Sequence, residues 1–360
     1  MPTRVRKAET SPSPAATLQQ GGLVYVSDEM PGLRRQRAGK GFRYIDAKGR
    51  AVRDAKTLAR VRSLAIPPAY TDVWISPRAN GHIQATGRDA RGRKQYRYHA
   101  QWNAARDGEK FERLEAFGAA LPKLRRHLRG DLKLRGFPER KVVAMVVAVM
   151  ADTLVRIGNA GYARENKSFG LTTLRNRHVS FLKGGRAHFS FRGKSGIEHD
   201  IDLTDAKLVK LMQQCQQLPG QHLFQYRDDA GRIRPVDSSQ VNDYLRETLG
   251  ETFTAKDFRT WGGTLAAVRL LADMPWDEDG ASQRAMASMR KSAEQSVARQ
   301  LGNTPAICRK SYIDPRVYAA WERGWLARHS AKARGPRQWE ALTLRLLRAH
   351  RAPGKKRAAK

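Results

Sequence analysis

The hydrophobic period of the chain changes near Trp102, and this change constrains the fold more than any other feature. Before it, short runs rich in Val, Ile, Tyr and Phe predict β-strands at 23–27, 42–46, 72–76, 82–86 and 93–98. One helix is predicted among these strands, at 55–64. After it, a 3.6-residue period predicts helices at 109–128, 138–156, 204–217, 238–248, 259–273, 281–300, 315–327 and 336–350.

One β-rich island interrupts the helical part. Strands are predicted at 179–182, 187–191 and 197–202, with Lys194 in the second hairpin loop. We therefore predict an α+β fold, with a small N-terminal β-sheet domain and a larger, mainly helical domain that contains a three-stranded sheet. The predicted organisation is a disordered arm, the sheet domain, the helical domain and a basic tail, at 1–20, 21–103, 104–350 and 351–360.

The charge of the chain indicates its partner. Lys and Arg number 68 against 34 Asp and Glu, a formal net charge of +34. An excess this large is typical of proteins whose partner is a polyanion, and nucleic acid is the first candidate. With 40% hydrophobic residues, this charge is expected on a folded body and not on a disordered chain.

Location is predicted from apolar runs and cysteines. The longest apolar run, Val142–Ala151, is about half of the ~20 residues that a membrane span needs. The first residues contain no apolar signal region, and two cysteines, Cys215 and Cys308, cannot build a disulfide framework. We expect an intracellular protein, in the cytoplasm and associated with the nucleoid.

The sequence does not match two common cofactor-binding motifs, the Walker A loop and the zinc-binding histidine motif. Gly193-Lys194-Ser195 looks like the end of a Walker A loop, but His188 stands where that loop requires glycine. The nine histidines include no HExxH motif and no short-spaced Cys/His set. We therefore expect no nucleotide cofactor, no metal and no other cofactor.

Cations and a hydroxyl lie where predicted elements end. Arg156 ends the apolar helix, Lys194 lies in a glycine-flanked hairpin loop, and Lys256 and Arg259 are one helical turn apart. Tyr312 follows a Gly-Asn-Thr-Pro break in the segment LGNTPAICRKSYIDP. Each has an ordinary structural explanation: a snorkelling arginine, a solvated turn lysine, a charged helix face and a packed tyrosine.

Taken together with Asn303, this ordered set resembles the active site of type IB DNA topoisomerases, in the compact poxvirus-like form found in bacteria. LGNTPAICRKSY is similar to the tyrosine motif of that family, KDFRTWGGT to its second-arginine motif, and VRIGNAGYARENKSFGLTTLRNRHV to its first-arginine motif. Within the last segment, Tyr162 lies at a DNA-contacting position. The resemblance covers residues 22–330.

The N-terminal part carries the remaining motif. The segment TDVWISPRANGHIQATGRDARGRKQYRYH resembles the family's GRKQY strand, which reads the major groove. The resemblance implies that Gln95 and Tyr96 contact the groove, with Arg93 and Lys94 beside them on DNA. It also implies that the sheet domain clamps the duplex while the helical domain carries the chemistry.

The resemblance further implies roles for the catalytic set. Tyr312 is the nucleophile, Arg156 and Arg259 bind the phosphate, Lys194 is the general acid, and Lys256 supports phosphate binding. The product is a 3′-phosphotyrosyl enzyme that relaxes positive and negative supercoils by strand swivelling and religates without ATP or metal. The expected form is a monomer on double-stranded DNA.

One residue departs from the family pattern. Asn303 stands where poxvirus and eukaryotic enzymes carry histidine, a replacement that bacterial members often show. An amide donates a hydrogen bond but carries no proton charge near neutral pH, so we assign Asn303 a hydrogen-bonding role.

Two alternatives remain open. Tyrosine recombinases share the Arg, Lys and Tyr arrangement, although they usually have a helical domain where this chain predicts a sheet. A basic architectural DNA-binding protein would explain the charge but not the ordered set. Asp314 could tune the nucleophile or cap a helix that begins near Pro315, and we expect the cap.

Overall fold

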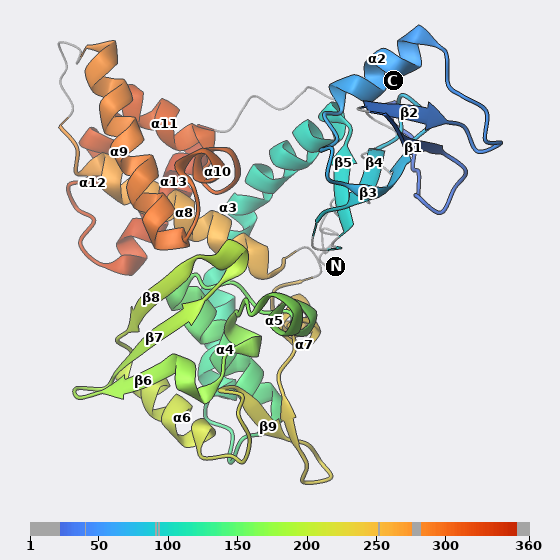
Figure 1. The fold of residues 1–360 in the computed structure, drawn as a ribbon. Coiled ribbons are helices and arrows are strands. Elements are labelled where there is room, and N and C mark those ends of the chain that lie inside the picture. The colour runs from blue at the N-terminus through green and yellow to red at the C-terminus, as the bar shows by residue number, and fades with distance from the viewer. Residues whose placement is uncertain are drawn as a thin grey trace, which may run out of the picture. The chain divides into compact units, whose positions relative to one another are not determined.

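The structure, a computed structural model, describes residues 22–39, 41–90, 92, 94–250, 253–275 and 282–350, without the side chains of 103–109 and 162. It divides into two compact units, residues 1–110 and 111–360 (Figure 1). The predicted arm at 1–20 and tail at 351–360 lie outside the described residues.

The N-terminal unit is a five-stranded antiparallel sheet in the order β2-β1-β3-β4-β5. Its strands are β1 (Leu33–Ala38), β2 (Gly41–Ile45), β3 (Thr71–Ile75), β4 (Ile83–Arg88) and β5 (Lys94–Tyr98). Helix α2 (Ala55–Ser63) packs on the sheet through Val61. The small core is formed by Leu33, Val61, Val73, Ile75 and Ala85.

The strand predicted at 23–27 is wrong. This segment makes a single β-bridge, between Val24 and Gly81. Its buried residues, Leu23 and Val26, are three apart and so do not follow the two-residue alternation of a strand, and Tyr25 is 67% exposed. The first full strand is β1, whose sequence LRRQRA has no apolar alternation. Its backbone pairs with β2 along its length and with β3 at one end, and this pairing stabilises a strand that its side chains do not predict.

The C-terminal unit is built around the apolar helix α4 (Glu139–Thr153). Residues 142–147 of α4 are buried on every side, against α6, α7, β8 and β9. The predicted three-stranded sheet is confirmed, in the order β6-β7-β8, and Phe189 and Phe191 of β7 point into the core. The elements of this part are α5 (Ala160–Asn166), β6 (Val179–Leu182), β7 (Arg186–Arg192), β8 (Glu198–Leu203), α6 (Ala206–Gln216), β9 (Gln225–Arg227), β10 (Ile233–Pro235) and α7 (Ser238–Leu249).

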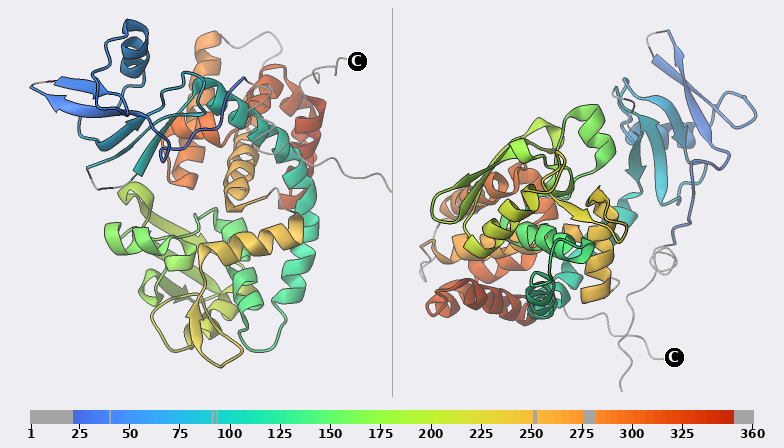
Figure 2. Two further views of the ribbon diagram at one scale, coloured as in Figure 1. Left: turned by 90° about the vertical axis from the view of Figure 1, so that its right-hand side faces the viewer. Right: turned by 90° about the horizontal axis from the view of Figure 1, so that it is seen from below.

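The remaining helices of this unit gather beside that part (Figures 1 and 2). They are α8 (Ala255–Ala272), α9 (Gln283–Leu301), α10 (Pro305–Ser311), α11 (Pro315–Glu322), α12 (Trp325–Ser330) and α13 (Pro336–Ala349). The long helix α3 (Ala100–Asp131) contains the boundary between the two units. In the described part of the chain, no helix is long and apolar enough to cross a membrane.

Three predicted helices have clearly wrong boundaries. The helix predicted at 109–128 is α3, which begins nine residues earlier, at Ala100, and ends at Asp131. The helix predicted at 138–156 ends at Thr153, because Leu154 takes the left-handed conformation with φ of 56°. The helix predicted at 315–327 is two helices, separated at Gly324, whose φ of 66° suits glycine. The expected α+β class is confirmed.

Candidate active site

Arg156 lies on the irregular segment 154–159 between α4 and α5, and not at the helix end as predicted. The carbonyl of Arg156 accepts a hydrogen bond from Leu171 N, at 2.9 Å. A Cβ on Gly170 would lie 2.6 Å from that carbonyl oxygen, so glycine is required for this close approach. This hydrogen bond holds the backbone of Arg156 against the segment at Gly170 and Leu171. The Arg156 guanidinium reaches Asn303, where Nη2 donates to Oδ1 over 2.8 Å.

Arg259 is buried in α8 with 4% of its surface exposed. Nη1 donates to the carbonyl of Leu154 over 2.6 Å and Nη2 to that of Leu301 over 2.7 Å. These carbonyls end α4 and α9, where the helix dipole is negative and stabilises a cation. Burial and the nearby charge of Arg156 lower the pKa of Arg259. The guanidinium is therefore held by the backbone of two other helices.

Two glycines explain the WGG sequence of α8. A Cβ on Gly262 would lie 2.4 Å from Cδ1 of Leu154, and one on Gly263 would lie 2.8 Å from the carbonyl oxygen of Tyr312. Larger residues would separate α8 from both segments. The glycines thus let the helix that carries Arg259 pack directly on the segment that carries Tyr312.

Tyr312 ends α10, and its backbone N–H donates to the carbonyl of Cys308 over 2.9 Å. Cζ of Arg259 lies 5.1 Å from the centre of the Tyr312 ring. Burial alone would raise the pKa of the phenol, but the charges and hydrogen-bond donors of Arg259 and Arg156 outweigh it, and the pKa of Tyr312 is lowered. The site therefore stabilises the phenolate, the nucleophilic form of tyrosine, relative to an ordinary tyrosine side chain.

Two buried donors of Arg259 and Asn303 lack acceptors among the described residues. Among the described residues, no hydrogen-bond partner contacts Nε of Arg259 or Nδ2 of Asn303. The Oδ1 atom of Asn303 is occupied by Arg156, which leaves its amide nitrogen to donate elsewhere. Buried N–H groups without acceptors cost free energy, so this arrangement suits an oxyanion such as a phosphodiester.

Lys194 is not joined to these four residues by a polar contact in the described part of the chain. It is exposed in the turn Lys194–Gly196 between β7 and β8, where Ser195 and Gly196 take positive φ values of 66° and 78°. In the described part of the chain, no hydrogen bond or ion pair joins Lys194 to Arg156, Arg259, Asn303 or Tyr312. The structure thus brings together four of the five predicted catalytic residues.

His199 is a residue of the site that the sequence analysis missed. Its ring is 9% exposed and stacks on Phe191 at a centroid distance of 5.0 Å. A Cβ on Gly193 or on Gly302 would lie 2.5 Å from that ring. The imidazole thus fills the space between the root of the Lys194 hairpin and the turn before Asn303. Burial and the charges of Arg156 and Arg259 lower its pKa.

The predicted groove-reading residues lie on β5 of the N-terminal unit. Tyr96 is 44% exposed and stacks on Tyr98 at 5.9 Å. Nζ of Lys94 pairs with Oδ2 of Asp28 over 2.6 Å, which raises the pKa of Lys94. Gln95 donates through Nε2 to Oδ2 of Asp89 over 2.9 Å.

The remaining predicted residues are placed as follows. Arg93 lies outside the described residues. Tyr162 belongs to α5, but its side chain also lies outside them. Lys256 is exposed in the first turn of α8. The predicted cap is confirmed, since Oδ1 of Asp314 accepts the backbone N–H of Arg316 over 2.9 Å at the start of α11.

Known proteins match both parts of the chain. A family model described as "Eukaryotic DNA topoisomerase I, catalytic core" matches residues 99–321, and one described as "Bacterial DNA topoisomerase IB, N-terminal domain" matches residues 41–89. DNA topoisomerase 1B of Acanthamoeba polyphaga mimivirus is 33% identical over 288 residues, which cover 79% of this chain and 85% of that protein. DNA topoisomerase 1 of Mycosarcoma maydis is 24% identical over 182 residues, 46% of this chain and 18% of that protein.

Proposed function

Because this chain belongs to the type IB DNA topoisomerases, we propose that Tyr312 attacks a backbone phosphodiester of duplex DNA and forms a 3′-phosphotyrosyl bond. The observations that carry this proposal are two buried donors without partners among the described residues, Arg259 Nε and Asn303 Nδ2, and the lowered pKa of Tyr312. Donors fixed before the reaction stabilise the charge that accumulates on the nonbridging oxygens without reorganising.

The step balances as a transesterification. The Tyr312 oxygen forms a bond to phosphorus, the bond from phosphorus to the 5′ oxygen breaks, and the phenol proton leaves to solvent or to a base. Lys194 donates a proton to the departing 5′ oxygen and takes it back during religation. The phosphotyrosyl ester retains the bond energy, so religation consumes no ATP, and no metal takes part in the proposed step.

Lys194 acts from an exposed position in this proposal. It lies on the turn Lys194–Gly196, in which Ser195 and Gly196 take positive φ values. We propose that the hairpin brings Lys194 to the leaving oxygen once DNA occupies the site. A general acid that arrives with the substrate would couple cleavage to correct binding.

DNA binding is proposed to involve both units. Tyr96, Gln95 and Lys94 contact the major groove from β5, together with Arg93, and Lys256 and Tyr162 contact the duplex. The free strand end swivels between cleavage and religation, which relaxes supercoils of either sign. We expect a monomer that acts in the cytoplasm, on the nucleoid. The N-terminal sheet argues against a tyrosine recombinase, which usually has a helical domain there.

The test is plasmid relaxation in EDTA without ATP. Wild type and Tyr312→Phe are incubated with negatively or positively supercoiled plasmid, and samples stopped with SDS are assayed for covalent adduct. We expect relaxation and adduct with wild type alone, while both proteins bind the plasmid. An SDS-stable adduct with Tyr312→Phe would remove Tyr312 from the role. Binding without relaxation by either protein would favour an architectural function, and strand exchange between two defined sites would favour a recombinase.

A further inference from the structure

Arg316, four residues after the end of the tyrosine motif at Tyr312, makes a buried ion pair with Asp314. Nε of Arg316 donates to Oδ1 of Asp314 over 2.9 Å and Nη2 donates to Oδ2 over 2.6 Å. The Asp314 side chain is 1% exposed and that of Arg316 is 19% exposed. A two-point pair of this kind fixes the orientation of both side chains, because the planar guanidinium matches the carboxylate.

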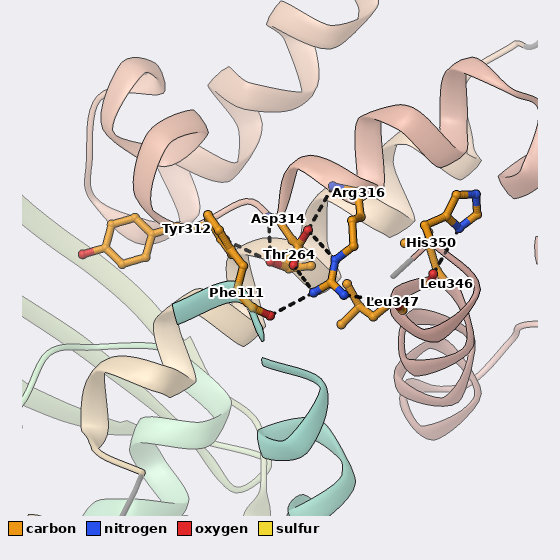
Figure 3. Close-up of polar contacts among 8 residues, drawn as sticks. All are labelled: Phe111, Thr264, Tyr312, Asp314, Arg316, Leu346, Leu347 and His350. Atoms are coloured by element: carbon orange, nitrogen blue, oxygen red, sulfur yellow. Dashed lines mark hydrogen bonds and ion pairs between the residues drawn. The ribbon is translucent and has the colours of Figure 1, made fainter. Parts of the chain in front are cut away.

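The same guanidinium also contacts two distant segments (Figure 3). Nη1 donates to the carbonyl of Leu347 in α13 over 3.0 Å, and Nη2 donates to the carbonyl of Phe111 in α3 over 2.9 Å. Arg316 therefore joins the start of α11 to the last turn of α13 and to α3 within the C-terminal unit. No lysine could make this set of contacts, since its single nitrogen has no fork.

The other side of the Asp314 turn is held by α8. Oγ1 of Thr264 accepts the backbone N–H of Asp314 over 3.1 Å and donates to the carbonyl of Tyr312 over 3.2 Å. The backbone from Tyr312 to Asp314 thus lies between Thr264 on one side and Arg316 on the other. Figure 3 shows the Tyr312 phenol pointing away from these contacts, which leaves it available to a substrate.

Helix α13 is firmly packed where it supplies its carbonyl. Leu346 and Leu347 are fully buried, and Trp339 and Leu342 of the same helix also enter the core. Arg348 pairs with Glu115 of α3 on the outside of this contact, at 3.1 Å. This helix follows the region 22–330 in which we recognise the family motifs, so those motifs assign it no role.

We propose that Arg316 is a positioning residue for Tyr312, and that α13 takes part in catalysis by supplying one of the two carbonyls that hold Arg316. The inference rests on the proposed function, in which Tyr312 is the nucleophile. Cleavage and religation both require the phenol oxygen in line with the scissile bond, and a displacement of about 1 Å can cost ~100-fold in rate. Arg316 restrains the backbone that follows the nucleophile, although it touches no substrate.

The test is single-turnover formation of the covalent adduct by Arg316→Ala, with DNA affinity measured separately in the Tyr312→Phe background. We expect a rate up to about 100-fold lower with affinity unchanged, and partial recovery of the rate in low millimolar guanidinium chloride. Sodium chloride at the same concentration should not restore it. Arg348→Ala removes a neighbouring α13 arginine that does not contact the turn, and should cleave at the wild-type rate.

Three results would overturn the proposal. They are cleavage by Arg316→Ala at the wild-type rate, equal losses of affinity and rate, and no recovery in guanidinium. If Arg316→Ala does not fold, Arg316→Lys keeps the charge without the fork, and a wild-type cleavage rate for this variant would exclude the bridging role. A covalent adduct formed by the single variant Tyr312→Phe would overturn the proposed function, because Tyr312 would not be the nucleophile. The cleavage rates of the Arg316 variants test the positioning role separately.

A double-mutant cycle tests the contribution of α13. Leu347→Ala keeps the backbone carbonyl but removes the buried side chain that packs this residue into the core. We expect this change to slow cleavage in the wild-type background and to have little further effect in Arg316→Ala, since residues that act through one contact are not additive. Equal effects in both backgrounds would show that α13 does not act through Arg316.

Discussion

The Cζ atom of Arg259 lies 5.1 Å from the ring centre of Tyr312, and its guanidinium is fixed by the carbonyls of Leu154 and Leu301. The cation beside the phenol is therefore placed by the ends of two helices and not by a flexible loop. Its remaining donor, Nε, is buried without a partner among the described residues. The same side chain can thus favour the phenolate before the reaction and bind the phosphate oxygens during it.

Replacement of Arg259 by Gln should slow cleavage and change its pH dependence. Removal of one preorganised donor typically costs about 100-fold to 1000-fold in rate. Because the charge of Arg259 lowers the pKa of Tyr312, its loss raises that pKa, and the rising limb of the pH–rate profile moves to higher pH. Single-turnover cleavage from neutral to alkaline pH measures both effects. Arg269→Gln, on the same helix but over Trp339, is the control. An unshifted limb would contradict this role of Arg259.

Lys194→Ala should lose cleavage activity only on substrates whose leaving group needs a proton. We expect cleavage of ordinary DNA to fall by about 100-fold to 10,000-fold. A substrate with sulfur in place of the bridging 5′ oxygen has a leaving thiolate that needs no general acid, so the variant should cleave it nearly as fast as wild type. Lys183→Ala, at the exposed turn of the β6–β7 hairpin, is the matched control and should cleave both substrates normally. Equal losses on both substrates would assign Lys194 to phosphate binding.

Much of this architecture could be predicted from the sequence, where side-chain pattern and structure coincide. Periodicity predicted four of the five strands of the N-terminal sheet, most of the long helices and the hairpin of Lys194, and Asp-Pro predicted the α11 cap. It did not predict β1, whose side chains do not alternate. His199 could not be found in this way, because Gly193 and Gly302, which enclose its ring, are far apart in the chain. The contacts of Arg316 were also hidden, since their acceptors are backbone carbonyls, which every residue carries.

Comparison of His199→Ala with His199→Phe should separate the effect of the ring's shape on cleavage from the effect of its titration on stability. The ring fills the space between Gly193 and Gly302, so Phe should preserve cleavage while Ala should reduce it by loosening the Lys194 hairpin. The folded-state pKa of His199 lies below the ordinary 6.5, so the unfolded chain binds more protons in acid. Its contribution to stability is therefore present above pH 6.5 and is lost as pH falls through the lowered pKa.

Melting temperatures near pH 7.5 and pH 5.5 check the sign of this pH dependence. The decrease in melting temperature on acidification should be smaller for His199→Phe than for wild type. His188, between Asp200 and Asp202, has a raised pKa and stabilises the fold at low pH, so His188→Phe should enlarge the drop. The same change in both variants would show that neither histidine titrates as described.

The salt dependence of binding tests the proposed phosphate contact of Lys256. Each phosphate neutralised by a cation contributes a slope of about −0.9 to log K against log salt, because counterions are released from DNA. Tyr312→Phe prevents cleavage, so binding can be measured at equilibrium in this background. Addition of Lys256→Ala should weaken binding to all sequences and make the slope shallower by about 1. Lys210→Ala, which removes an exposed lysine of α6 for which we propose no DNA contact, should leave the slope unchanged. If both lysines change the slope equally, Lys256 contributes only to the general positive field of the protein.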